Sequence, residues 1–157
     1  MLSNYMSTVT PAHHTEPAAD LSASASELRI ATFRLARRMR TQRAVDSMSD
    51  GQFAVLAGLF IHGSHTLGEL ADRERVSAPS MNRTVNCLQE SGYVRRSADE
   101  TDGRKVVISL TDEGRAVVDE TARRRDAWVE EALADLTARE RKTIADAAKI
   151  MQRMVAR

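Results

Sequence analysis

The sequence predicts a mainly α-helical chain that carries one small β-hairpin, an α+β fold. Helix-start signals recur along its 157 residues, and they delimit segments in which apolar residues follow helical spacing. One short segment, 105–110, instead alternates apolar and polar residues, as a half-buried strand does. It follows two short predicted helices, and two helices followed by a hairpin are the outline of a winged helix-turn-helix.

The helix starts share one pattern: Ser or Thr at the cap and Glu or Gln three residues later, which together satisfy free backbone N–H groups. The pairs are Ser24/Glu27, Ser49/Gln52, Thr66/Glu69 and Thr137/Glu140. They predict helices at about 24–44, 49–62, 66–74 and 137–155.

Two further helices and the hairpin complete the fold. Ser77 caps a helix over about 77–91, with Pro79 in its first turn and Gly92 just past its end. Thr111 or Asp112 opens a long helix that runs to about residue 133. The strand at 105–110 is predicted to pair with 93–97, and Asp102-Gly103 supplies the turn.

The chain length fits one domain better than two. Residues 1–21 lack periodicity and are predicted to be a flexible tail, within which Met6 is an alternative start. The domain spans 22–157, with the winged helix-turn-helix at about 49–110. The flanking helices, about 24–44 and 111–157, carry apolar stripes that a winged helix does not need. We expect them to pair two copies of the chain; packing within one chain is the alternative.

Composition restricts the function without deciding it. The net charge is only +1, but arginines dominate residues 29–43 and acidic residues follow Thr111. A nearly neutral protein of this kind can still carry a basic face that contacts phosphate. One cysteine, Cys87, excludes an internal disulfide and fits a reducing compartment. With no apolar run of membrane-spanning length, we expect a cytoplasmic protein.

The helix at 77–91 has the composition of a recognition helix. Met81, Val85 and Leu88 form its core stripe, and the polar side chains lie off that stripe. The residues predicted to contact DNA from this helix are Ser77, Ser80, Asn82, Arg83 and Asn86. Arg83 is the strongest candidate, because a guanidinium grips guanine or phosphate with two bonds. The alternative is an ordinary solvated face.

The hairpin tip at about 97–105 is predicted to act as a wing. Arg104 and Lys105 supply charge for the minor groove or the DNA backbone, while Asp102 orients Arg104 or caps the turn. Arg95 and Arg96 lie on the first strand; one suits a phosphate contact and the other a structural pair. Of these two we include Arg96 among the predicted DNA contacts.

These residues together resemble the MarR family of bacterial regulators. The motif S-A-P-S-M-N-R-x-V-x-x-L-x-x-x-G-Y-V-x-R, the wing D-G-R and the following V-x-I-S-L-T-x-x-G carry the resemblance, which covers the chain from about residue 23. It implies a homodimer whose terminal helices form the dimer interface and whose two lobes bind a pseudo-palindrome. It also implies that Arg83 lies on the recognition helix and that Asp102 holds Arg104 for the minor groove. Members of the family commonly release DNA when a small, often phenolic, ligand or an oxidant acts on them, and a ligand response is not implied for this chain by the resemblance alone.

Other functional signals are weak. Apolar residues near helix junctions that are candidates for a ligand pocket, or plain core, are Met39, Phe53, Phe60 and Trp128. His62 and His65 lack further metal ligands at suitable spacing, and Cys87 is predicted to be partly buried. We expect no metal, no cofactor and no enzymatic activity, because no phosphate loop, nucleophile elbow or paired carboxylates occur.

The sequence therefore predicts a homodimeric DNA-binding transcriptional regulator, a repressor that binds a pseudo-palindromic operator. The alternative is a winged-helix module for protein–protein contact without sequence-specific DNA binding.

Overall fold

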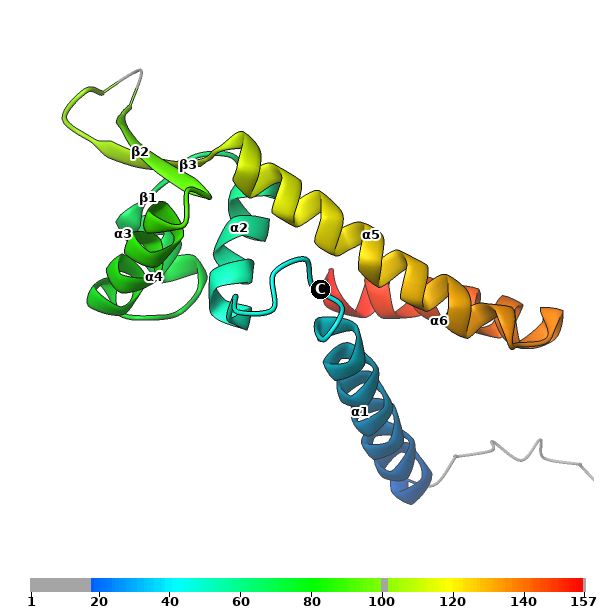
Figure 1. Cartoon of the computed structure of the whole chain (residues 1–157). Helices are drawn as coiled ribbons and strands as arrows, with labels where there is room; N and C mark the ends of the chain where they lie inside the picture. The colour runs from blue at the N-terminus through cyan, green and yellow to red at the C-terminus, as the bar shows by residue number, and fades with distance from the viewer. Residues whose placement is uncertain (1–17, 100–101, 157) are drawn as a thin grey trace, which may run out of the picture. The chain divides into compact units, whose positions relative to one another are not determined.

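The computed structural model describes residues 18–99 and 102–156 (Figure 1). Two compact units divide after Arg37, within the first helix. The elements in chain order are α1 (Ala18–Arg40), α2 (Asp50–His62), β1 (His65–Thr66), α3 (Leu67–Arg73), α4 (Ala78–Glu90), β2 (Val94–Ala98), β3 (Val106–Leu110), α5 (Asp112–Ala134) and α6 (Ala138–Val155). This order confirms the predicted mainly helical fold with a hairpin wing.

The strands form one antiparallel sheet in the order β1-β3-β2. The hairpin pairs Val94 with Leu110 and Ala98 with Val106, each strand within one residue of its prediction. Strand β1 was not predicted, because two residues are too short to show alternation; it exists through pairing with β3. Val106 and Ile108 share one face of β3, but Val106 is 55% exposed because it lies at the outer end of the hairpin, whereas Ile108 is buried.

The hydrophobic core lies within the winged helix-turn-helix. Helix α2 contributes Val55, Leu56 and Leu59, and helix α5 contributes Val118. The residues that close this core from the remaining elements are Met48, Leu70, Ala71, Met81, Val85, Leu88, Val94 and Ile108. The core thus holds the helix-turn-helix, the sheet and the first part of α5 as one body.

Most predicted helix starts are confirmed. Ser49, Thr66 and Thr137 each form a complete capping box with the Gln or Glu three residues later. Ser77 caps α4 through the Ser80 N–H, and Thr111 caps α5. Local sequence decides these boundaries because the cap and its partner are close in the chain.

Helix α1 departs from prediction at both ends. It begins at Ala18, so Ser24 lies inside the helix and caps nothing, and residues 18–21 of the predicted tail are helical. Alanine favours helix strongly, which lets the helix extend through the expected cap. The remainder of the predicted tail, including Met6, lies outside the described residues.

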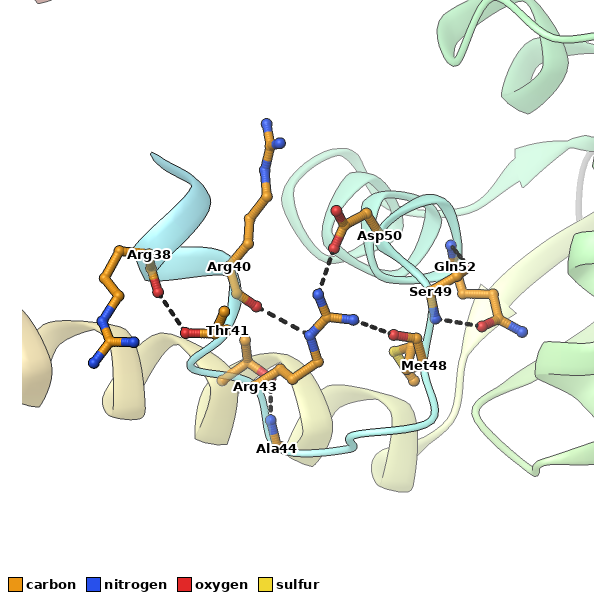
Figure 2. A network of polar contacts seen from close by, with 10 residues as sticks. Arg38, Arg40, Thr41, Arg43, Ala44, Met48, Ser49, Asp50 and Gln52 are labelled. Carbon is orange, nitrogen blue, oxygen red and sulfur yellow. Dashed lines mark hydrogen bonds and ion pairs between the residues drawn. The ribbon is translucent and has the colours of Figure 1, made fainter. Parts of the chain in front are cut away.

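The helix ends at Arg40, four residues before the expected boundary, because Arg43 folds back on it (Figure 2). The Arg43 guanidinium donates to the carbonyl of Arg40 at 3.0 Å, to the carbonyl of Met48, and to the Asp50 carboxylate at 2.7 Å. One side chain thereby ties the end of α1 to the start of α2.

A second junction joins the end of α4 to the start of α5. Gly92 adopts φ 78°, and the Thr111 hydroxyl donates to its carbonyl at 2.6 Å. The Thr111 N–H donates to the Tyr93 carbonyl at 3.1 Å. Gly114 packs so closely that a Cβ there would lie 2.0 Å from the Tyr93 oxygen. The position of the recognition helix is therefore fixed relative to the long helix.

Candidate DNA-binding surface

The turn between α3 and α4 sets how the recognition helix leaves its scaffold. Arg75 has φ 54°, in the left-handed region. Its N–H donates to the Asp72 carbonyl at 3.2 Å, and the Val76 N–H donates to the Ala71 carbonyl at 3.0 Å. This is the Schellman pattern that ends α3, with arginine in the position that usually holds glycine. The chain reverses sharply there and starts α4 at Ser77.

Helix α4 has the two faces that a recognition helix requires. Met81, Val85 and Leu88 are each at most 2% exposed and anchor it in the core. Arg83 points from the opposite side and is exposed, together with Ser77 at the N-terminus, while Ser80 is half-buried. The N-terminal backbone and the Arg83 guanidinium are thus available to phosphates and base edges.

Arg96 does not extend into solvent but bonds to the flank of α4. Its Nη2 donates to Asn82 Oδ1 at 3.1 Å and to Asn86 Oδ1 at 2.8 Å, and its Nη1 donates to Gln89 Oε1. Arg96 thus bonds to Asn82 and to Asn86, two other residues that were predicted to contact DNA. Gln89 was missed, although the i, i+4, i+7 spacing of three amides was readable in the sequence.

Strand alternation explains why Arg95 and Arg96 differ. Val94 is 2% exposed, and Arg96, two residues on, shares its face of the sheet. Arg95 lies on the other face, where its Nε donates to Ser109 Oγ at 3.2 Å. Alternation along the strand predicts that Arg95 and Arg96 lie on opposite faces. Which of the two faces the core depended on knowing that Val94 is buried.

At the wing, Asp102 organises the backbone. Its Oδ1 accepts the Arg104 backbone N–H at 3.2 Å, and its carbonyl accepts the Lys105 N–H at 2.8 Å. Its carboxylate lies 3.8 Å from Lys105 Nζ. Asp102 therefore caps the turn, and within residues 18–99 and 102–156 the Arg104 guanidinium has no ion-pair partner. These bonds agree with the alternative that Asp102 caps the turn, while its role in holding Arg104 for the minor groove stays a prediction.

The four predicted ligand-pocket residues have different neighbours in the described part of the chain. Phe53 lines a hollow of about 420 Å³ with Arg40, Asp50 and Arg125, but this lining does not include Met39, Phe60 or Trp128. The Phe60 ring instead lies 5.4 Å from the Arg115 guanidinium carbon. The grouping of these four residues around a ligand stays a prediction.

Arg125 gives this hollow its chemical character. Its guanidinium carbon lies 4.5 Å from the centre of the Phe53 ring. Its Nε is buried without a hydrogen-bond partner in the described part of the chain. Burial, and secondarily the nearby Arg43 charge, lower the pKa of Arg125, which nevertheless stays protonated at neutral pH. Arg125 lies within a charged run at 123–126, and nothing in the sequence indicated that one of these arginines is partly buried.

Cys87 is exposed on α4, contrary to the prediction that it is partly buried. It falls beyond the edge of the stripe formed by Met81, Val85 and Leu88, and helical spacing alone does not define where that edge lies.

The terminal helices keep their apolar stripes exposed in one copy of the chain. On α1, Leu21 is 76% and Phe33 is 64% exposed. Helix α6 has no buried residue, and its Met154 is 55% exposed. Amphipathic helices of this kind need a partner surface.

A core-anchored helix after a tight turn, followed by a capped wing, defines a winged helix-turn-helix DNA-binding protein. The family model described as "MarR family" matches residues 48–106, which cover the helix-turn-helix and the wing. None of the helices that the structure describes combines the length and apolar character needed to cross a bilayer.

Known proteins agree with this class. An uncharacterised HTH-type transcriptional regulator of Mycobacterium bovis is 37% identical over 131 residues, which are 83% of this chain and 92% of that protein. The HTH-type transcriptional repressor YetL of Bacillus subtilis is 32% identical over 109 residues, 66% of this chain and 65% of that protein. A solved structure of a Pseudomonas aeruginosa protein assigned as a transcriptional regulator has 28% identity and a TM-score of 0.79, covering 90% of this chain and 99% of that one.

The chain belongs to the MarR family. It is a DNA-binding transcriptional regulator rather than an enzyme, which confirms the prediction from the sequence.

Proposed function

We propose that the protein is a homodimeric repressor that binds a pseudo-palindromic operator. The observation that carries the proposal is that α4 is anchored in the core by one face and exposes its opposite face beside the capped wing. Arg83 and the N-terminal Ser77 and Ser80 contact the major groove and its phosphates, and Arg104 contacts the flanking minor groove or DNA backbone. Repression is supported by the name of the relative YetL. A bacterial regulator of this kind works in the cytoplasm.

The dimer is supported by the exposed apolar residues of the terminal helices. On α6, Ile144, Ile150 and Met154 are each about half exposed or more. A second copy offers the same helices, and burying them pairs two recognition helices about one turn of DNA apart. Sedimentation at micromolar concentration tests this: a dimer is expected, and a monomer would refute it.

DNA recognition is tested by selecting bound duplexes from a random pool and then measuring affinity at fixed salt. Arg83→Ala is expected to weaken the selected site by about 1–3 kcal/mol and to relax preference at one position. Arg104→Ala is expected to weaken the affinity for many DNA sequences alike and to flatten the salt dependence of that affinity.

Arg139→Ala, an exposed arginine on α6, is the matched control for loss of one charge. If neither Arg83→Ala nor Arg104→Ala differs from it, the assigned roles are wrong. A wild-type protein that enriches no site favours the protein-contact alternative.

The hollow beside Phe53 favours a small aromatic anion as effector. Phe53 offers a ring face, and Arg125 with Arg40 offers positive charge, while Asp50 is already paired with Arg43. An anionic ligand would supply the partner that Arg125 Nε lacks among the described residues.

Benzoate and phenol separate the charge from the ring. In calorimetry, the wild-type protein is expected to bind benzoate more tightly than phenol. Arg125→Met and Phe53→Ala are each expected to weaken benzoate binding at least tenfold. Phe60→Ala removes a similar ring outside this lining and is the control. Binding that survives both site changes would place any effector elsewhere.

A further inference from the structure

Three amide side chains lie in a row on the flank of α4 that meets strand β2. Asn82, Asn86 and Gln89 stand at i, i+4 and i+7, so they share one side of the helix. Each accepts a hydrogen bond from the Arg96 guanidinium through its carbonyl oxygen, at 3.1 Å for Asn82 and 2.8 Å for Asn86. We call these four residues the Arg96 clamp. It joins the recognition helix to the wing by side chains alone.

The chemistry of arginine fixes which way the amides point. A guanidinium carries only donors, so it bonds the oxygen of an amide and never its NH₂ group. The Oδ1 atoms of Asn82 and Asn86 must therefore face Arg96. Their Nδ2 groups are directed away from it. On the recognition helix these two asparagines consequently offer N–H donors.

This orientation matters for reading bases. Asparagine pairs with adenine through two bonds, accepting from N6 with its oxygen and donating to N7. An oxygen held by Arg96 is withdrawn from that pairing. Guanine presents two acceptors, N7 and O6, to a donor in the major groove, whereas cytosine presents only a donor. An outward amide donor finds two acceptors on guanine but only N7 on adenine and only O4 on thymine, so two such donors favour guanine.

We propose that Arg96 is a positioning residue that sets base preference, by holding Asn82 and Asn86 as donors toward guanine rather than as two-bond partners of adenine. The inference rests on the proposed operator binding, because it concerns how a bound site is read. It assigns Arg96 a role through its neighbours in place of a contact with DNA.

The surroundings of Arg96 disfavour a phosphate contact. The side chain is half-buried on the core face of the sheet, and three hydrogen bonds occupy its Nη atoms. The hollow of about 290 Å³ beside it is also lined by Glu90. A carboxylate there repels phosphate. Because the acceptors of the clamp are uncharged amides, salt screens it little, unlike a phosphate contact.

The test compares Arg96→Met with Arg95→Met. Both remove one charge from the same strand, but only Arg96 belongs to the clamp. Each dimeric variant is taken through selection from a random duplex pool, and its affinity for the best wild-type site and its single-base variants is measured at two salt concentrations. In Arg96→Met, discrimination of guanine from adenine is expected to fall about tenfold at the affected positions. Salt dependence is expected to match that of Arg95→Met.

A second variant keeps the test decisive if Arg96→Met fails to fold. Asn86→Asp retains an acceptor for Arg96 but replaces the outward donor by a negatively charged acceptor. It is expected to fold, to weaken binding to all sites through its charge, and to lose guanine preference at one position. Unchanged base preference in Asn86→Asp, or in a folded Arg96→Met, would overturn the inference.

A uniform loss of affinity in Arg96→Met, with a flatter salt dependence than Arg95→Met, would also overturn it, by showing a phosphate contact. A wild-type protein that enriches no site would overturn the proposed operator binding itself, a result distinct from any of these.

Discussion

Gly114 is the residue at which the structure tolerates least change. A Cβ there would lie 2.0 Å from the Tyr93 carbonyl oxygen, and also 3.1 Å from Leu110 Cδ2. Real Cβ atoms essentially never approach another heavy atom closer than 3.0 Å, so Gly114→Ala forces α5 and the start of β2 about 1 Å apart. The oxygen belongs to main chain, which cannot rotate away as a flexible side chain does.

The displacement acts on hydrogen bonds that join α4 to α5. The Thr111 N–H to Tyr93 carbonyl bond and the Thr111 hydroxyl to Gly92 carbonyl bond cross this junction. Losing both costs about 1 kcal/mol each, and overpacking adds about 1–3 kcal/mol. Alanine's better helix propensity returns about 1 kcal/mol. The free energy of unfolding is therefore expected to fall by about 2–4 kcal/mol.

Urea unfolding at fixed protein concentration measures this loss. Gly51→Ala is the matched control, because Gly51 also lies near a helix start and a Cβ added there would meet nothing within 4 Å. It is expected to change stability by less than about 1 kcal/mol. A Gly114→Ala protein within about 0.5 kcal/mol of wild type would refute the reasoning. Operator affinity is expected to drop with stability, because the junction orients α4.

Three further predictions concern the scaffold. Arg75→Gly is expected to raise stability by about 0.5 kcal/mol in thermal unfolding, because glycine accepts φ 54° without a Cβ clash; a loss would contradict this, and Arg75→Ala is expected to gain nothing. Arg43→Met is expected to cost about 2 kcal/mol in urea unfolding, since the bonds to Arg40, Met48 and Asp50 are lost together. The control Arg38→Met, at an exposed arginine, is expected to cost under about 0.5 kcal/mol. Equal losses would show that Arg43 does not stabilise this junction. Hydrogen bonds from Arg123, then Arg124, lower the pKa of Glu120 from 4.5 to about 2. The contribution of Glu120 to stability is therefore complete above pH 4.5 and is lost as pH falls toward 2. Glu120→Gln is expected to flatten the pH dependence of the urea midpoint in that window, and an unchanged profile would show that the pairs do not form in solution.

Much of the fold was predictable because its signals are local. Ser49, Thr66 and Thr137 cap helices with partners three residues away. Ser24 shows the limit, since the same pattern lies inside α1 when the preceding residues also favour helix. Strand β1 shows another, because its two residues become a strand only by pairing with β3, far along the chain.

The candidate site divides in the same way. Helical spacing placed Arg83 opposite the core stripe, and the structure has it exposed. Spacing did not place Arg96 or Arg125, because each finds its neighbours on another element. The end of α1 was equally out of reach, since the Arg43 side chain that bonds the Arg40 carbonyl is itself held by Met48 and Asp50 at the start of α2.

The sequence by itself determined the class of protein, the recognition helix and the wing, because periodicity, caps and turn residues act within a few positions of the chain. Only the tertiary structure decided what the polar side chains do there. Arg96 turned inward because its strand packs Val94 into the core, and the Asp102 carboxylate bonds the Arg104 main chain. Hydrogen bonds between distant elements depend on where the core places each backbone, and that placement is a property of the whole fold.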